Sequence, residues 1–107
     1  MPPFIAQPLR ELKRRLSLRM GERLKDVRLY GSWARGEPRV GSDIDVLVVV
    51  QDLTEDDRHL VFEVDAQLLV ESGVAFSVHV MSTQRLEFLI DKEVGYALDL
   101  EREGISA

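Results

Sequence analysis

The sequence lacks cysteine and has no long hydrophobic run. Without cysteine the chain forms neither a disulfide nor a thiolate metal site, which fits a cytoplasmic protein. Its longest uninterrupted apolar run, Val46 to Val50, is far shorter than the roughly 20 residues of a membrane span. The amino terminus has no basic start followed by an apolar stretch, so no secretory signal is expected. We therefore expect a cytoplasmic protein that makes no contact with a membrane.

Basic residues are scarce after the first third of the chain. Residues 1–39 hold ten Lys/Arg and four Asp/Glu, residues 40–107 hold four and fifteen, and the net charge is -5. An acidic chain neutralises few phosphates, so direct nucleic-acid binding is not expected. The basic first third either attracts a polyphosphate or is the solvated face of a helix, and the helix face is the favoured interpretation. Its arginines would be Arg10, Arg14, Arg15 and Arg19.

Length and periodicity predict one α/β domain over residues 1–107, built on a small sheet. Thr54 is an expected helix cap, Gly73 an expected helix end, and Ser82 or Thr83 caps the last helix. The second strand is apolar on both faces, which is typical of a central strand. Expected helices cover 8–20, 54–72 and the region from 83 onward, and expected strands cover 27–30, 43–51 and 74–81.

Two carboxylates open the most apolar strand. Asp43 and Asp45 flank Ile44, and the two-residue period of a strand places both carboxylates on one face while Ile44 faces the core. Adjacent carboxylates repel each other unless a cation lies between them, and magnesium prefers oxygen ligands of this kind. Asp43 and Asp45 are therefore candidate metal ligands, with Mg²⁺ as the expected ion. Such an ion can bridge the oxygens of a triphosphate.

A candidate phosphate-binding turn lies upstream of this pair. Gly31 permits close approach of the backbone to a ligand, and Ser32 offers a hydroxyl and an amide at the start of a helical turn. Arg35 is within reach of the same phosphates. Alone, Gly-Ser is an ordinary turn and Asp-x-Asp an ordinary solvated strand entrance. Together, with a strand expected beside each, they favour a site for a nucleotide and a metal.

Three segments resemble the minimal nucleotidyltransferases (MNT), small members of the DNA polymerase β-like superfamily: Gly31-Ser32, Arg35-Gly36 and Ser42-Asp43-x-Asp45-Val46-Leu47-Val48. The resemblance is weaker elsewhere and extends to the closing residues 101–105. It implies a small mixed β-sheet flanked by helices, and transfer of AMP from ATP with two magnesium ions. On this basis Asp43 and Asp45 are the expected catalytic carboxylates. Residues expected to contact the nucleotide are Gly31, Ser32, Arg35 and Ser42.

The resemblance also implies a partner. Many minimal nucleotidyltransferases are encoded beside a HEPN-domain protein and act as its antitoxin. They adenylylate a tyrosine of the HEPN ribonuclease toxin, or they mask the toxin by binding it. A HEPN toxin is therefore the expected partner, ATP the expected substrate, and a homo- or hetero-oligomer remains open.

Active members of the superfamily normally use a third carboxylate on a strand that neighbours the pair. The expected strand over 74–81 offers Ala75, Ser77, His79 and Met81 on its open face, and none is an acid. His79 and Ser77 are the candidates for this third position. A polar residue at a sheet face or partner interface is the favoured interpretation of His79, and Ser77 is a weaker ligand than a carboxylate.

Glu63, Asp65 and Trp33 are expected to lie outside the functional site. Glu63 and Asp65 are expected to face solvent from the helix that precedes the last strand. Trp33 follows the Gly-Ser turn, and packing is favoured over stacking on a base.

Three functions are compatible with these residues. The first is a magnesium-dependent adenylyltransferase antitoxin that modifies a tyrosine of its HEPN partner. The second is a catalytically degenerate module that neutralises the toxin by binding alone, which the absent third acid favours. The third is one subunit of a two-component nucleotidyltransferase for a small hydroxylated substrate.

Overall fold

A computed structural model describes residues 1–36, 43–92 and 105–106 of the chain. None of the described helices combines the length and apolar character that a bilayer span requires. In chain order the elements are α1 (Pro3–Met20), the 3-10 turn η1 (Gly21–Arg23), β1 (Leu24–Tyr30), β2 (Asp45–Val50), α2 (Glu55–Ser72), β3 (Ser77–Ser82), α3 (Thr83–Asp91) and β4 (Ile105–Ser106).

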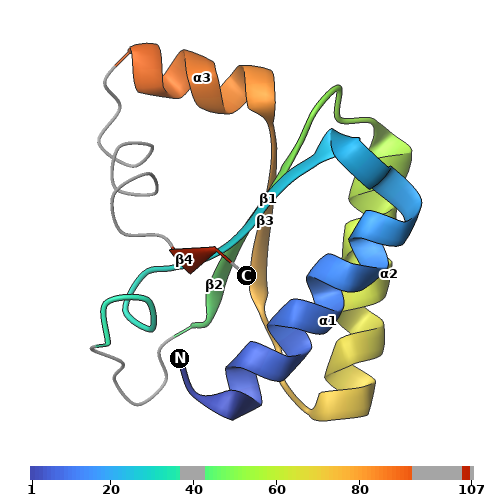
Figure 1. Cartoon of the computed structure of the whole chain (residues 1–107), viewed down its shortest axis with the longest axis vertical. Coiled ribbons are helices and arrows are strands. Elements are labelled where there is room, and N and C mark those ends of the chain that lie inside the picture. Colours follow the sequence, from blue (N-terminus) through green and yellow to red (C-terminus); the bar gives the residue numbers. More distant parts are fainter. Residues whose placement is uncertain (37–42, 93–104, 107) are drawn as a thin grey trace.

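The described strands form one mixed sheet in the order β3-β2-β1-β4. β2 runs parallel to β3 and antiparallel to β1, and β1 is also antiparallel to β4. Helices α1 and α2 lie side by side on one face of this sheet, and α3 lies on the other side (Figure 1). The expected small mixed sheet flanked by helices is therefore confirmed.

Strand β2 is the centre of the molecule and is buried on both faces. Val46, Val48 and Val50 are fully buried in the core beneath α1 and α2. Leu47 and Val49 point to the opposite face and are also buried, where Leu86 of α3 packs against them. The expectation of a central strand is confirmed.

Helix α1 begins five residues earlier than the expected 8–20. Pro3 occupies the first turn, where its missing N–H and fixed φ cost nothing. Pro8 lies inside the helix and removes one backbone hydrogen bond. Ile5 is fully buried and extends the apolar stripe by one turn, and burial of this kind opposes that loss.

The arginines of α1 largely form the expected solvated face. Arg10, Arg14 and Arg19 are exposed. Arg15 differs, since it donates to Glu11 at 2.8 Å and to Glu71 of α2 at 2.7 Å. Arg15 therefore joins the two helices, which sequence periodicity did not indicate.

Strands β1 and β3 differ from their expected bounds because pairing with β2 decides where they start. β1 reaches back to Leu24, which pairs with Val50 at the far end of β2. β3 begins only at Ser77, the partner of Asp45 at the start of β2, although the alternating pattern begins at 74. β4 was not expected, since two residues are too short to show an alternation.

Helix α2 begins and ends at the expected residues. Thr54 and Asp57 form a capping box in which each side chain accepts a hydrogen bond from the other residue's backbone N–H. Gly73 ends the helix in the left-handed region at φ 75°. Asp57 is buried and also pairs with Arg23 of η1. The capping carboxylate therefore ties α2 to the segment that follows α1.

The Asp57 contacts predict an acid-sensitive contribution to stability. Burial alone would raise the pKa of Asp57, but the Thr54 N–H and the Arg23 guanidinium outweigh it, so the pKa is lowered from its ordinary 3.8. The ionised side chain therefore stabilises the fold above about pH 4, and this contribution is lost as the pH falls through the lowered pKa. We expect Asp57→Ala to lower the free energy of unfolding at pH 7 by about 2 kcal/mol.

Urea denaturation at pH 7 and at pH 3 measures this effect. The exposed neighbour Asp56→Ala is the control and should lose only about 0.5 kcal/mol from the helix dipole. The difference between Asp57→Ala and the unchanged chain should shrink at the lower pH. Equal losses for the two variants, or a difference that does not depend on pH, would contradict the account.

Candidate nucleotide and metal site

The turn after β1 lies directly on the carboxylate that opens β2. Tyr30, the last residue of β1, pairs with Asp45, the first residue of β2. Gly31 follows with φ +76°, and a Cβ at this position would lie 2.6 Å from the Asp45 Oδ2 atom. Only glycine allows both this backbone conformation and this approach. The structure thus brings together the two halves of the motif that the sequence analysis joined by spacing.

A short hydrogen-bonded turn follows Gly31. The Arg35 N–H donates to the Gly31 carbonyl at 3.1 Å, and the Gly36 N–H donates to the Trp33 carbonyl at 3.3 Å. The helical turn expected to start at Ser32 is thus present as one hydrogen-bonded turn, which does not continue into a helix. Ser32 is half-buried at its start, and Arg35 is exposed at its end.

Trp33 anchors this turn to the core. Its side chain packs against the core residues beneath α1 and α2. Its ring meets the Phe4 ring edge-on, with centroids 5.6 Å apart and planes at 83°. The expectation that Trp33 packs is confirmed, and its contact with α1 holds the Gly31 turn against the sheet.

The charges at the start of β2 interact. Asp45 is half-buried and Asp43 is exposed two residues earlier. Burial raises the pKa of Asp45, the negative charge of Asp43 raises it further, and His79 opposes the shift. Concentrated negative charge of this kind is relieved by a cation. Oxygen donors from two carboxylates fit a hard divalent ion such as magnesium, which Asp43 and Asp45 would share.

The neighbouring strand brings Ser77 and His79 to the same face. Ser77 is the register partner of Asp45, and His79 is the partner of Leu47 one step along. His79 is exposed, and its ring lies 6.0 Å from that of Tyr30. Within residues 1–36, 43–92 and 105–106, no group of three or more His, Cys, Asp or Glu side chains could hold a metal. One more carboxylate, Asp26 of β1, lies on this face of the described sheet, but it pairs with Val49 towards the other end of β2 and accepts a hydrogen bond from Arg28. Among the described residues, no third carboxylate therefore lies beside Asp43 and Asp45.

The expectation that both acids of α2 face solvent is wrong for Asp65. Glu63 is exposed, but Asp65 is half-buried and its Oδ1 atom is buried without a hydrogen-bond partner. Burial raises the pKa of this carboxyl. Asp65 lies one helical turn after Val61 and three residues before Leu68, at the border between the buried and the exposed sides of α2. The apolar periodicity therefore assigned Asp65 to the exposed side. Because α2 covers the face opposite Asp45, Asp65 does not supply the third carboxylate.

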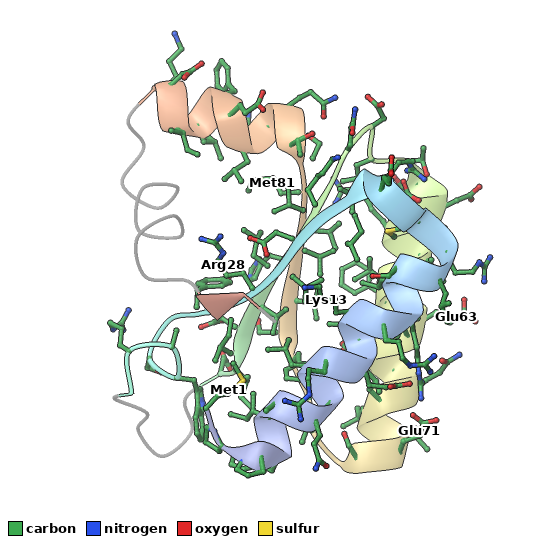
Figure 2. The ribbon with its side chains drawn as sticks, viewed as in Figure 1. Met1, Lys13, Arg28, Glu63, Glu71 and Met81 are labelled. Carbon is green, nitrogen blue, oxygen red and sulfur yellow. The ribbon has the colours of Figure 1, made fainter. Side chains whose placement is uncertain are left out.

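A cavity that the sequence did not indicate lies on the Asp45 face of the sheet. Its volume is about 220 Å³, with Leu47 and Val49 of β2 as its floor, Leu86 of α3 as a wall, and Lys25 and Arg28 of β1 at its edge. Figure 2 shows Arg28 on the α3 side of the sheet. The Arg28 guanidinium donates to Asp26 at 2.8 Å. This cavity arises where α3 spans the sheet, and periodicity carries no signal for such a crossing.

Two sequence expectations lie outside the described residues. Ser42, an expected nucleotide contact, precedes the described part of β2. The segment 101–104, which resembles the usual end of the minimal nucleotidyltransferases, precedes β4.

The small mixed sheet with flanking helices is the fold of a nucleotidyltransferase domain. A family model described as "Nucleotidyltransferase domain" matches residues 9–101, so the chain belongs to this family. Members of the family generally use a divalent metal and a nucleoside triphosphate. Among the curated proteins, none matches this chain.

Three solved structures share the fold. One is a toxin–antitoxin complex with AMP-PNP, at 18% identity and a TM-score of 0.52. Another is an MntA-HpeT toxin–antitoxin structure with two aspartates changed to glutamate, at 16% identity and a TM-score of 0.52. A third is the MntA-HpeT structure with a tyrosine changed to alanine, at 18% identity and a TM-score of 0.53. The first two matches each cover 90% of this chain and 69% of the matched chain. The third match covers 92% of this chain and 70% of the matched chain. At these identities the likeness concerns the fold.

The Gly31 geometry predicts a position that tolerates no side chain. Gly31→Ala adds a clash with the Asp45 carboxylate to the strain of a positive φ. Gly73→Ala is the control, with φ +75° and nothing within 4 Å of its added Cβ. We expect Gly73→Ala to cost about 1 kcal/mol from strain alone, and Gly31→Ala about 2–3 kcal/mol.

Urea unfolding gives these two costs, and calorimetric titration with magnesium and a non-hydrolysable ATP analogue measures ligand binding. Binding should be lost in Gly31→Ala and kept in Gly73→Ala. Equal stability losses together with intact binding in both variants would show that Gly31 is only a turn.

Proposed function

We propose that this chain is the antitoxin of a toxin–antitoxin pair and transfers AMP from ATP to a tyrosine of its toxin, a HEPN ribonuclease. The observation that carries the proposal is the Gly31 backbone lying against the Asp45 carboxylate, with a Cβ position only 2.6 Å from Oδ2. Family membership supports nucleotidyl transfer. The likeness in fold to toxin–antitoxin complexes, one of them with AMP-PNP, supports the partner and the nucleotide.

Each residue of the site has a separate role in this proposal. Asp43 and Asp45 would hold magnesium, which when bound neutralises charge on the triphosphate. The Ser32 amide and hydroxyl and the Arg35 guanidinium would contact phosphate oxygens, with Gly31 and Ser42 beside them. The tyrosine oxygen bonds to the α-phosphorus as the bond to pyrophosphate breaks, so the tyrosine proton must pass to a base. His79 faces this site and is the described candidate.

A second candidate function is masking of the toxin without catalysis. The observation that favours it is that, among the described residues, no third carboxylate groups with Asp43 and Asp45. In this case the nucleotide site is retained from an active ancestor, and neutralisation depends on binding alone.

Modification of the toxin separates these two functions. We expect the chain, incubated with ATP, magnesium and the toxin encoded beside it, to add AMP to a toxin tyrosine. Asp45→Asn and Asp43→Asn should each reduce the rate at least ~100-fold, because charge stabilisation at the phosphates is lost. Intact-mass spectrometry of the toxin measures the transfer.

Asp91→Asn, an exposed aspartate at the end of α3, is the control and should modify the toxin normally. A toxin that stays unmodified, yet is inhibited equally well by Asp45→Asn, would establish masking instead.

A carboxylate introduced on β3 tests the incomplete metal site. His79→Asp should bind manganese or magnesium roughly tenfold more tightly than the unchanged chain, because it adds an anionic ligand on the face that carries Asp45. Ser77→Asp is the comparison at the register partner of Asp45 and shows which position is closer to the ion.

Calorimetric titration with each metal measures the affinities without any need for turnover. Unchanged affinity in both variants would mean that Asp45 does not hold the ion.

A further inference from the structure

Helices α1 and α2 cover one face of the sheet and carry opposite charge. Helix α1 holds five Lys/Arg and a single acid, Glu11, whereas α2 holds six Asp/Glu and a single arginine, Arg58. The basic residues of α1 are Arg10, Lys13, Arg14, Arg15 and Arg19, and the acidic residues of α2 are Glu55, Asp56, Asp57, Glu63, Asp65 and Glu71. A positive helix and a negative helix therefore lie side by side.

The two helices run in opposite directions (Figure 1). Arg15 of α1 donates to Glu71 near the end of α2 at 2.7 Å, and Arg23, just after α1, pairs with Asp57 at the start of α2. Between these two contacts lies a groove of about 220 Å³. Its lining includes Leu18 and Arg19 of α1 and Leu60, Glu63 and Gln67 of α2. Arg19 and Glu63 therefore lie at the same level on the two sides of the groove.

Some of the charges pair inside the chain. Glu11 accepts from Arg14 and Arg15, and Glu71 accepts from Arg15. Figure 2 shows Glu63 on the side of α2 away from the sheet. Exposed charges outside these pairs include Arg10 and Arg19 on α1 and Asp56 and Glu63 on α2. Both signs are thus presented to a partner, each on its own helix.

Apolar side chains are exposed between these charges. Leu18 is 72% exposed at the border of the groove, and Val70 is 87% exposed. Val70 lies three residues after Gln67 and seven after Glu63, so it shares their side of α2. Large apolar side chains that gather on one face mark an interaction surface. The two-helix face is defined here as Arg14, Leu18 and Arg19 of α1 with Glu63, Gln67 and Val70 of α2.

The other exposed apolar side chains of α2 do not belong to this face. Phe62 and Leu69 lie four and eleven residues after Arg58, so the three share one side of the helix. The Arg58 guanidinium lies 3.5 Å from the Val80 carbonyl of β3. This side of α2 is therefore the side away from α1.

The charge pattern excludes several partners. Nucleic acid and an anionic membrane are attracted by α1 but repelled by α2 beside it. A toxin that receives AMP must reach the Asp45 face, which lies on the other side of the sheet. The two-helix face needs a partner with a negative and a positive half side by side.

A second copy of the chain has this pattern. A two-fold axis along the groove, parallel to both helices, sets α1 of each copy on α2 of the other. The rotation keeps every residue at its level, so Arg19 faces Glu63 of the second copy, and the reciprocal contact forms with it. A two-fold axis across the helices would instead set α1 on α1 and α2 on α2, which is repulsive.

We propose that the chain forms a two-fold dimer through the two-helix face, with α1 of each copy on α2 of the other. Leu18 and Val70 supply the apolar anchors, and Arg19 and Glu63 supply the charged contacts. Both Asp45 faces then point outward, so two toxin molecules have access to the two sites at once. The inference goes beyond the proposed function, because the dimer needs neither nucleotide nor toxin.

Charge reversal on one helix at a time tests the pairing. Arg19→Glu and Glu63→Arg should each weaken the dimer at least ~10-fold, because either change sets like charges against each other at both symmetric contacts. Arg85→Glu and Glu87→Arg, exposed residues of α3, are the matched controls and should leave the dimer unchanged. Sedimentation velocity over a range of protein concentrations measures the dimer dissociation constant, and thermal unfolding confirms that each variant folds.

A mixture of the two reversed variants distinguishes the two-fold contact from any other. In the mixed dimer the introduced glutamate at position 19 faces the introduced arginine at position 63, and the unchanged Glu63 faces the unchanged Arg19. We therefore expect an equimolar mixture of Arg19→Glu and Glu63→Arg to recover the dimer, although each variant alone is weakened. Within each chain the two positions still carry like charges, so recovery reports contact between copies and not repair of the fold.

The apolar anchor is tested separately. Leu18→Glu should weaken the dimer at least ~100-fold, since it removes an apolar contact and sets a negative charge against α2 of the second copy. Phe88→Glu on α3 is the control, because Phe88 is also largely exposed, at 50%, and lies outside the two-helix face. Sedimentation velocity again measures the dissociation constant.

The outcomes decide the inference without reference to catalysis. A dimer that is lost in Leu18→Glu and recovered in the mixture supports it. A monomeric unchanged chain, a dimer that survives Leu18→Glu, or reversed variants that fail to recover on mixing each overturn it. A monomeric chain that loses toxin binding in Leu18→Glu assigns the face to the toxin and also overturns it. AMP transfer is measured on the toxin itself, so the proposed function stands or fails separately.

Discussion

The candidate site depends on the close approach of the Gly31 backbone to the Asp45 carboxylate. Because Gly31 has no side chain, its backbone can adopt a positive φ. It can also lie so close to Asp45 that a Cβ on Gly31 would clash with the Asp45 Oδ2 atom. The buried strands on either side hold this approach in place, because Tyr30 pairs directly with Asp45. Trp33 supports the turn from the other side through its contact with Phe4 of α1. The Asp45 carboxylate is therefore held beside the Gly31 backbone, and this combination suits an anionic ligand that carries its own cation.

Strand β2 separates a packing face from a chemical face. Val46, Val48 and Val50 build the core with α1 and α2. Asp45, Leu47 and Val49 lie on the other face, where Leu47 and Val49 line the cavity beside α3. The period of two thus lets one strand support the fold and position a carboxylate. Helix α2 is divided in a similar way, because Val61, Val64 and Leu68 are buried in the core and Phe62, Leu69 and Val70 are exposed. The candidate nucleotide site and helix α2 therefore lie on opposite faces of the sheet.

Features that depend on local chemistry could be predicted from the sequence. The Thr54 cap, the end at Gly73 and the central position of β2 follow from side-chain hydrogen bonding, backbone conformation and burial on both faces. The Gly-Ser turn and the Asp-x-Asp pair were joined by their spacing, and the structure places them in contact.

Features that depend on pairing or packing with distant residues could not be predicted. β3 starts where β2 supplies a partner, and β4 is defined by the pairing of its two residues with Arg28 and Leu29 of β1. Asp65 lies at the border between buried and exposed sides, where periodicity is ambiguous. The cavity exists because α3 crosses the sheet, which depends on tertiary packing.

Amide chemical shifts of the isolated chain during titration with magnesium and a non-hydrolysable ATP analogue test the central claim most directly. If Gly31 and Asp45 form one nucleotide and metal site, the largest shifts occur at the amides of Gly31, Ser32, Arg35 and Asp45. The amides of exposed α2 residues on the opposite face of the sheet, such as Phe62 and Leu69, then stay unchanged. Saturating ligand that leaves the Gly31 turn and the start of β2 unperturbed would contradict the account.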